Sequence, residues 1–148
     1  MSAESSLELP DEAATLRLGA ALAVGVAPGR TLFLSGELGT GKTTLVRGML
    51  RALGHEGRVK SPSYPLVELY RLSRLHFYHF DFYRFKNEAE WLDSGFREYF
   101  DAQSACVVEW PERAGGLLPA PTLAVGLEIA GSGRRAHLSS PSPEGAGW

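Results

Sequence analysis

The sequence predicts a single α/β domain, in which a central mixed sheet is flanked by helices and a β-hairpin follows at the C-terminal end. Its 148 residues, 44% of them hydrophobic, suit one well-packed core. Apolar runs of strand length at residues 31–35 and 105–110 alternate with longer segments of helical pattern. No repeat or long linker divides the chain, so we expect one domain over residues 1–140 and a disordered tail over residues 141–148.

The first elements are bounded by residues that start or end helices. Asp11 is placed to begin a helix whose first turn is acidic. One face of this helix carries Ala14, Leu18, Ala21 and Leu22. In chain order we expect a strand at 6–10, a helix at 11–25, a strand at 31–35, a glycine-rich loop at 36–41, a helix at 42–54 that a glycine closes, and a polar loop at 55–63.

The second half of the chain alternates short strands with one interrupted helix. Pro65 lacks a backbone N–H, which favours an edge of the sheet, or the first position, for the strand that contains it. We expect a break in the helix near Ser94 and Gly95. The elements are strands at 64–70 and 75–85 joined through 71–74, a helix at 87–101, a buried strand at 105–110, a loop with a helical turn at 111–121, and a closing hairpin with strands at 122–131 and 134–140.

Charge and cysteine content narrow the class of protein. Fifteen Lys and Arg against 17 Asp and Glu give a net charge of −2, so strong autonomous RNA binding is not expected. A local basic edge stays open, as does its alternative, a solvated helix face; the residues concerned are Arg47, Arg51, Arg58 and Lys60. The single Cys106 lies in an apolar run, as a buried small hydrophobe would. There is no signal-peptide pattern and no apolar stretch near the ~20 residues of a membrane span, so we expect a cytoplasmic protein without membrane contact.

Residues 36–43 read GELGTGKT and fit the phosphate-binding pattern G-x-x-x-x-G-K-[ST]. Glycines allow successive backbone N–H groups to aim at phosphate oxygens, and the following helix adds the positive end of its dipole. Lys42 would reach the terminal phosphates, and the Thr43 hydroxyl is a Mg²⁺ ligand. This predicts a P-loop NTPase domain; the alternative is a glycine turn with a stray lysine. The expected nucleotide contacts from this loop are Glu37, Leu38, Gly39, Thr40, Gly41, Lys42, Thr43 and Thr44.

Hydrolysis of a nucleotide also needs an acid that supports Mg²⁺ and a group that orients water. Asp81 and Glu109 each end an apolar run, and strand ends meet at one edge of an open α/β sheet. The alternative for each is an ordinary surface acid. Ser61, Ser63 and Tyr64 lie where P-loop proteins often have a switch loop, although a polar turn before an edge strand explains them equally well.

His76 and His79 alternate with phenylalanines in the run HFYHF. A strand period puts them on opposite faces, and a third metal ligand is missing at a convincing spacing. We therefore expect structural or surface roles for both.

The sequence closely resembles the bacterial TsaE (YjeE) family of P-loop ATPases. The resemblance covers roughly residues 7–139, in the family's order and spacing. The stretches that carry it are LPDEAATLRLG, GELGTGKTT, VKSPSYPLVELY, YHFDFYR, GFREYF and VVEWPE.

The resemblance implies a role in forming N6-threonylcarbamoyladenosine next to the anticodon of tRNAs that read codons beginning with A. Members of the family bind ATP or ADP with Mg²⁺, hydrolyse ATP slowly alone, and support repeated turnover of the TsaB and TsaD proteins. TsaD holds the transferase centre, so tRNA is met through the complex.

The resemblance also implies roles for single residues. Lys42, Asp81 and Glu109 would be catalytic, with Thr43 and Glu109 serving Mg²⁺. Trp110 matches the tryptophan that follows the family's acid.

Three further residues match the nucleotide-binding region of the family. Asp11 and Thr15 fall in the segment near the base, and Arg134 falls in a C-terminal region that also approaches the nucleotide. One departure concerns the switch loop, where Ser63 stands in place of the usual threonine. The hydroxyl is kept and the methyl group is lost, which puts the rigidity of the loop in doubt.

Two other functions stay open from the residues. A small-molecule kinase would use the same phosphate cradle, but the chain has no long insertion for the arginine-bearing lid that such kinases usually carry. A nucleotide switch would bind ATP without hydrolysing it and only report ATP to a partner. Phosphate release without an acceptor distinguishes the first of these, and a Glu109 variant that binds but does not turn over distinguishes the second.

Overall fold

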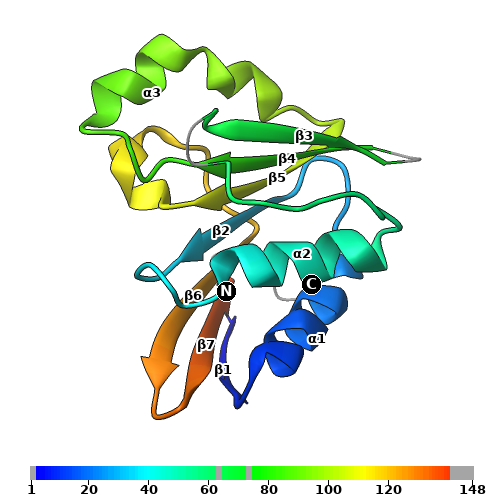
Figure 1. The fold of residues 1–148 in the computed structure, drawn as a ribbon. Coiled ribbons are helices and arrows are strands. Elements are labelled where there is room, and N and C mark those ends of the chain that lie inside the picture. Colours follow the sequence, from blue (N-terminus) through cyan, green and yellow to red (C-terminus); the bar gives the residue numbers. More distant parts are fainter. Residues whose placement is uncertain (1–2, 63–64, 73–74, 141–148) are drawn as a thin grey trace.

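The computed structural model describes residues 3–62, 65–72 and 75–140, which form one seven-stranded sheet with helices on its faces (Figure 1). The residues expected as a tail, 141–148, lie outside the described ranges. The strands are β1 Ala3–Leu9, β2 Thr31–Ser35, β3 Val67–Arg71, β4 His76–Asp81, β5 Ser104–Glu109, β6 Leu123–Ala130 and β7 Gly133–Ser140. The helices are α1 Glu12–Ala23, α2 Lys42–Ala52 and α3 Glu88–Ser94, with 3₁₀ segments η1 Phe96–Tyr99 and η2 Pro111–Leu117.

The sheet is mixed, as predicted, with the strand order β1-β7-β6-β2-β5-β4-β3. Its centre is parallel, because β2 pairs in parallel with β5 and β6, and β4 with β5. The pairs β3–β4, β6–β7 and β1–β7 are antiparallel, so the closing hairpin is confirmed and the two strands joined through residues 71–74 also pair with each other. The strand after Pro65 lies at an edge, as its missing N–H predicts. The carboxyl ends of β2, β4 and β5 therefore share one edge of the sheet.

Alternate side chains of the central strands supply two hydrophobic clusters on opposite faces. On β5, Ala105 and Val107 join the cluster that includes residues of α1 and α2. Cys106 and Val108 join an aromatic cluster with Trp91 of α3. Cys106 is buried, in agreement with its expected role as a small hydrophobe.

Helix α1 packs closely against α2 through two glycines. A Cβ on Gly48 would lie 2.4 Å from the backbone oxygen of Leu16, and one on Gly19 would lie 2.2 Å from that of Leu45. Three of the four residues expected on the buried face of α1, Ala14, Leu18 and Leu22, are buried, but the face is rotated: Ala21 is exposed, and Thr15 and Gly19 are buried in its place. The rotation follows from this close contact, which turns the glycine side of α1 toward α2.

The strand expected at 75–85 is shorter in the structure, whereas the helix expected at 87–101 breaks where the sequence predicted. The strand expected at 75–85 ends at Asp81, because the Asp81 carboxylate accepts from the Tyr83 N–H and Phe85 N–H bonds the Phe82 carbonyl, closing a turn. The helix expected at 87–101 breaks at Gly95, whose φ of 75° is left-handed, and continues as η1. Within the described ranges, no helix combines the length and the apolar character needed to cross a membrane.

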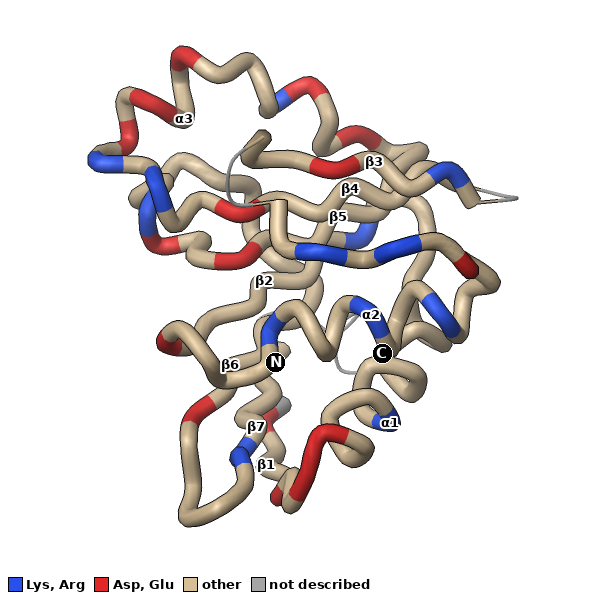
Figure 2. The backbone as a smooth tube through the Cα atoms, viewed as in Figure 1, with Lys and Arg blue, Asp and Glu red and all other residues tan. Residues whose placement is uncertain are grey.

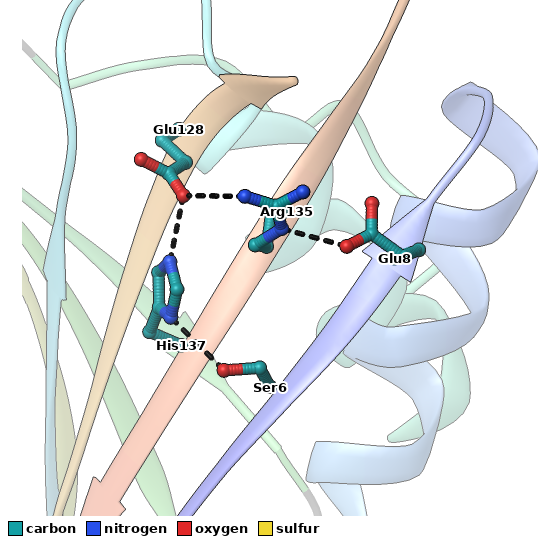
Figure 3. A network of polar contacts seen from close by, with 5 residues as sticks. All are labelled: Ser6, Glu8, Glu128, Arg135 and His137. Atoms are coloured by element: carbon teal, nitrogen blue, oxygen red, sulfur yellow. Dashed lines mark hydrogen bonds and ion pairs between the residues drawn. The ribbon is translucent and has the colours of Figure 1, made fainter. Parts of the chain in front are cut away.

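An exposed polar network ties β1 to the closing hairpin (Figure 3). Arg135 of β7 lies between Glu8 of β1, at 2.6 Å, and Glu128 of β6, at 3.5 Å. His137 contacts Glu128 at 2.7 Å and Ser6 at 3.0 Å. Exposed pairs of this kind contribute little to stability. The network is therefore consistent with the register of the three strands but adds little to the free energy that holds them together.

Candidate nucleotide site

A cleft of about 520 Å³ opens at the shared strand edge, between the start of α1, the glycine-rich loop and the β6–β7 turn. This volume lies in the range of small-ligand sites, roughly 300–1,000 Å³. It brings together most residues that the sequence indicated: Asp11, Thr15, Leu38, Gly39, Thr40, Gly41, Lys42, Thr43, Thr44, Ser61, Asp81, Glu109, Trp110 and Arg134. Glu37 does not line the cleft, and Ser63 and Tyr64 lie outside the described residues. The sequence did not indicate Leu9, Glu12, Ser132 and Gly133, which also line it.

The glycine-rich loop has a backbone that only glycine adopts easily. Gly36, Gly39 and Gly41 have φ values of 143°, 82° and 100°. At Gly36 a Cβ would also lie 2.5 Å from the Leu127 carbonyl oxygen. Helix α2 begins directly after the loop without a side-chain cap, so its first N–H groups are available to an anion in the cleft.

Lys42 is buried at the inner wall of the loop. Its Nζ donates to the Gly36 carbonyl and lies 4.2 Å from the centroid of the Trp110 ring. Burial lowers the pKa of Lys42, and the nearby carboxylates of Glu109 and Asp81 oppose part of that shift. A phosphate in the loop would supply the negative charge that the present carbonyl partners lack.

Asp81 and Glu109 end neighbouring parallel strands and face each other in register. Both are buried, at 4% and 2% exposure. Asp81 accepts from the Tyr83 N–H through Oδ1 and from the Ser61 hydroxyl through Oδ2, each at 2.9 Å. The exposed Ser61, from the segment expected as a switch loop, is thereby joined to the acid at the end of β4.

Glu109 contacts a residue that sequence reasoning did not select for the site. His79 Nε2 lies 2.5 Å from Glu109 Oε2, and the imidazole is completely buried. His76 is exposed, so the two histidines do lie on opposite faces of β4. The signal in the sequence was the period of the strand, which puts His79 on the same face as Asp81.

Trp110 follows Glu109 in a left-handed conformation, with φ 56° and ψ 50°. Such a backbone is unusual for a bulky residue and ends β5 abruptly. The indole ring contacts two cations, Lys42 and Arg113, and the guanidinium carbon of Arg113 is 5.3 Å from the ring centroid. The turn thus directs both the acid and the ring that follows it toward the cleft.

The far wall of the cleft comes from α1 and β7. Asp11 caps α1, since its Oδ1 accepts from the Ala14 N–H at 2.9 Å, as its position predicted. A Cβ on Gly41 would lie 3.6 Å from the Thr15 methyl group, so α1 begins beside the loop. From β7, Arg134 donates to the Gly39 carbonyl at 2.9 Å.

The donors in the cleft fit Mg²⁺ bound together with phosphate. No group of three or more His, Cys, Asp or Glu side chains suited to hold an ion occurs in the part of the chain that the structure describes. Mg²⁺ usually needs only one or two carboxylates, because waters and phosphate oxygens complete its shell. The Thr43 hydroxyl and the Glu109 carboxylate, both lining the cleft, are such a set.

Two of the four residues of the possible basic edge, Arg47 and Arg51, contact other groups of the protein. Arg47 lies 3.6 Å from Glu12, and Arg51 donates to the carbonyls of His55, at 3.0 Å, and Gly57, at 2.5 Å. Figure 2 shows basic and acidic residues interspersed over the backbone. Arg58 and Lys60 are both exposed, in the loop that follows α2.

Comparison with known proteins converges on one family. The family model for the threonylcarbamoyl adenosine biosynthesis protein TsaE matches residues 9–137. The chain is 41% identical over 135 residues to the tRNA threonylcarbamoyladenosine biosynthesis protein TsaE of Haemophilus influenzae, covering 88% of this chain and 85% of that protein. It is 39% identical over 108 residues to the protein of that name from Bacillus subtilis, covering 73% and 67%. A crystal structure of Bacillus subtilis YdiB is similar with a TM-score of 0.82 and 28% identity, over 96% of this chain and 88% of that one.

Proposed function

Because the chain belongs to the TsaE family and so to tRNA threonylcarbamoyladenosine biosynthesis, we propose that it is the Mg²⁺-dependent ATPase component of that machinery. One observation carries this proposal. The carboxylates of Asp81 and Glu109 lie in register beside the buried Lys42, in the cleft that the glycine-rich loop forms. A cradle for phosphate and two acids at adjacent strand ends are the parts that ATP hydrolysis needs.

Each part of the cleft has a task in this proposal. Backbone N–H groups of the loop and the Lys42 ammonium bind the phosphates, while Thr43 and Glu109 hold Mg²⁺. When bound, the ion neutralises charge on the phosphate oxygens. Asp81 links the nucleotide to the loop of Ser61, since its carboxylate already accepts from that hydroxyl.

The base of ATP would lie on the side of the cleft where α1 begins. Asp11 and Thr15 line that side, and Arg134 closes it from β7. These residues would orient ATP so that its phosphates enter the loop.

The contacts of Arg134 favour one function, an ATPase whose site is completed by a partner protein. They do not favour the alternative, a small-molecule kinase. Among the described residues that line the cleft, Arg134 is the only arginine, and its guanidinium donates to Gly39 and Gly133 carbonyls. A kinase needs cationic groups over the transferring phosphate as well as a site for the acceptor. We therefore propose that the chain hydrolyses ATP slowly alone and acts with TsaB and TsaD in the cytoplasm, meeting tRNA through that complex.

Phosphate release tests the proposal. We expect slow release from ATP and Mg²⁺ by the chain alone, with no acceptor, and faster release when the TsaB–TsaD pair is added. The chain with Glu109→Gln serves as the control for a contaminating ATPase. Release that depends on an added small-molecule acceptor would favour a kinase, and ATP binding without release in any mixture would favour a switch.

A further inference from the structure

His79 has the character of a buried polar group with a single task. Its ring has no exposed surface and lies on the same face of β4 as Phe77, which belongs to the cluster that includes residues of α2. Nε2 is 2.5 Å from Glu109 Oε2, and Nδ1 has no hydrogen-bond partner among the described residues. Burial of an unpartnered ring nitrogen costs free energy that an apolar side chain at this position would not. Packing alone therefore does not explain a histidine here.

The strand pairing fixes which acid the imidazole reaches. In the parallel pair β4–β5, His79 is in register with Val107, and Asp81 is in register with Glu109. His79 thus lies two residues before Asp81, on the same face of β4. Its side chain extends diagonally to Glu109 on the neighbouring strand β5. The Asp81 oxygens instead accept from the Tyr83 N–H and the Ser61 hydroxyl.

The two acids differ in how their oxygens are used. Both oxygens of Asp81 accept hydrogen bonds from the protein. Glu109 has one oxygen, Oε2, on the imidazole, and this carboxylate lines the cleft. Because Oε2 is next to the imidazole, Oε1 is the oxygen of Glu109 that can coordinate a cation.

We propose, on the basis of the function proposed above, that His79 is a positioning residue for Mg²⁺ binding by Glu109. It donates from Nε2–H to Oε2, fixes the rotamer of the carboxylate, and so presents Oε1 to the ion. A group that orients a metal ligand in this way typically changes metal affinity by about 10–100-fold when removed. His79 itself touches neither the nucleotide nor the ion.

Two substitutions of similar size separate hydrogen bonding from packing. His79→Gln keeps an N–H donor near the position of Nε2, and His79→Met has a similar length without a donor. Calorimetry first measures the ATP affinity in EDTA. Titration with Mg²⁺ then gives the Mg²⁺ concentration at which half of the metal-dependent change in ATP affinity is reached. We expect all variants to bind ATP alike in EDTA. His79→Met should need about tenfold more Mg²⁺ or more, while His79→Gln stays near the wild type.

The exposed His137–Glu128 contact provides a matched control (Figure 3). His137→Met removes the same kind of bond outside the cleft and should leave the Mg²⁺ requirement unchanged. In the Glu109→Gln background, His79→Met should have no further effect on Mg²⁺, because the two residues act as one unit. Equal Mg²⁺ requirements for His79→Met and His79→Gln would overturn the inference.

A measurement without nucleotide keeps the test valid if His79→Met does not fold. In the ¹⁵N-histidine spectrum of the wild-type chain, His79 Nε2 should carry a hydrogen, and Glu109→Gln should shift this resonance while Glu128→Gln does not. An Nε2 without hydrogen, or a resonance indifferent to Glu109→Gln, would overturn the contact itself. Failure of the wild type to bind ATP would instead overturn the proposed function, so the two failures are distinct.

Discussion

At the scale of single residues, the site depends on charged groups that the fold buries beside one another. Lys42, Asp81 and Glu109 are 5%, 4% and 2% exposed. Buried charges are costly unless they are paired or hydrogen-bonded. Burial lowers the pKa of Lys42, and the carboxylates of Glu109 and Asp81 act in the opposite direction. The three groups are therefore close enough to influence one another electrostatically.

Removal of the lysine should abolish useful ATP binding. Lys42→Ala deletes a buried cation that faces the loop carbonyls, and no other side chain of residues 36–43 carries positive charge. Calorimetry with ATP and Mg²⁺ measures the effect, and the exposed Lys60→Ala is the control for loss of a lysine elsewhere. Near-normal affinity in Lys42→Ala would contradict the assignment of the cradle.

Neutralising the acid of β5 should separate binding from hydrolysis. Glu109→Gln keeps the size of the side chain and loses the charge that supports Mg²⁺, so hydrolysis should fall about a hundredfold or more while much nucleotide binding remains. Phosphate release and calorimetry on one preparation test this, with Glu128→Gln as the exposed control. Wild-type turnover would refute the role.

Asp81→Asn should also impair turnover. An amide at this position can accept from only one of the two donors, Ser61 and Tyr83, that the carboxylate now holds. Phosphate release measures the loss, and Ser61→Ala tests the contact from the other side. Turnover unchanged in both variants would show that the link to this loop is not used.

The thiol of Cys106 should be inert in the folded protein. Burial raises its pKa from 9.0 to about 12, and the side chain packs in the aromatic cluster. A thiol reagent at pH 8 should label the chain only after denaturation. Because the folded state keeps this proton between about pH 9 and 12 while the unfolded state loses it, the group lowers the free energy of unfolding as pH rises through that window. Fast labelling of the folded chain would contradict the burial.

At the scale of elements, the contact between α1 and α2 positions one wall of the cleft. Gly48→Ala would bring a methyl group to 2.4 Å from the Leu16 carbonyl oxygen, so the helices must move apart. We expect the free energy of unfolding to fall by about 1–3 kcal/mol in spite of the better helix propensity of alanine. Urea unfolding measures it. Gly116→Ala, where a Cβ meets nothing within 4 Å, should be close to neutral, and equal effects of both changes would reject this account.

Local patterns were sufficient to predict most elements and the position of the glycine-rich loop. The strand at Thr31–Ser35, the cap at Asp11 and the break at Gly95 follow from signals within a few residues. The face of α1 could not be predicted fully, because the close approach of Gly19 to α2 depends on tertiary packing. The prediction made the strand that ends at Asp81 too long, because aromatic residues follow it directly in the sequence. In the structure the chain turns after Asp81, and Phe82 and Phe85 pack in the aromatic cluster.

The unexpected site residues share a different cause. His79 reaches Glu109 because β4 and β5 are neighbours, and Gly133 reaches the cleft because β7 lies between β1 and β6. Pairing between distant strands sets both relations, and no short stretch of sequence contains it. The motif thus predicted the loop, while the strand order decided what surrounds it.

At the scale of the whole molecule, the glycine-rich loop, both acids and the start of α1 lie together at one end of the strands. The β1–β7–β6 part contributes Arg134 and Gly133 from the opposite side. Transition-state charge is stabilised weakly where water has access. A chain that depends on partners to complete this cleft should hydrolyse ATP poorly by itself, and a group supplied in trans raises rates about a thousandfold or more in other P-loop proteins.

Assembly with TsaB and TsaD should therefore raise ATP hydrolysis, and the rise should need the acid of β5. Phosphate release from the mixture measures this, with the Glu109→Gln chain in place of the wild type as the matched control. Rapid hydrolysis by the isolated chain that the pair does not increase would contradict a shared site.

The most direct test of the central claim, that the ATP cleft of this chain supports repeated tRNA modification, is the number of modified tRNAs formed per TsaB–TsaD complex. The reaction is run with the wild-type chain, with Lys42→Ala and with no chain added. We predict multiple turnovers with the wild type and no more with Lys42→Ala than in the absence of the chain. Full multiple turnover with Lys42→Ala would contradict the claim.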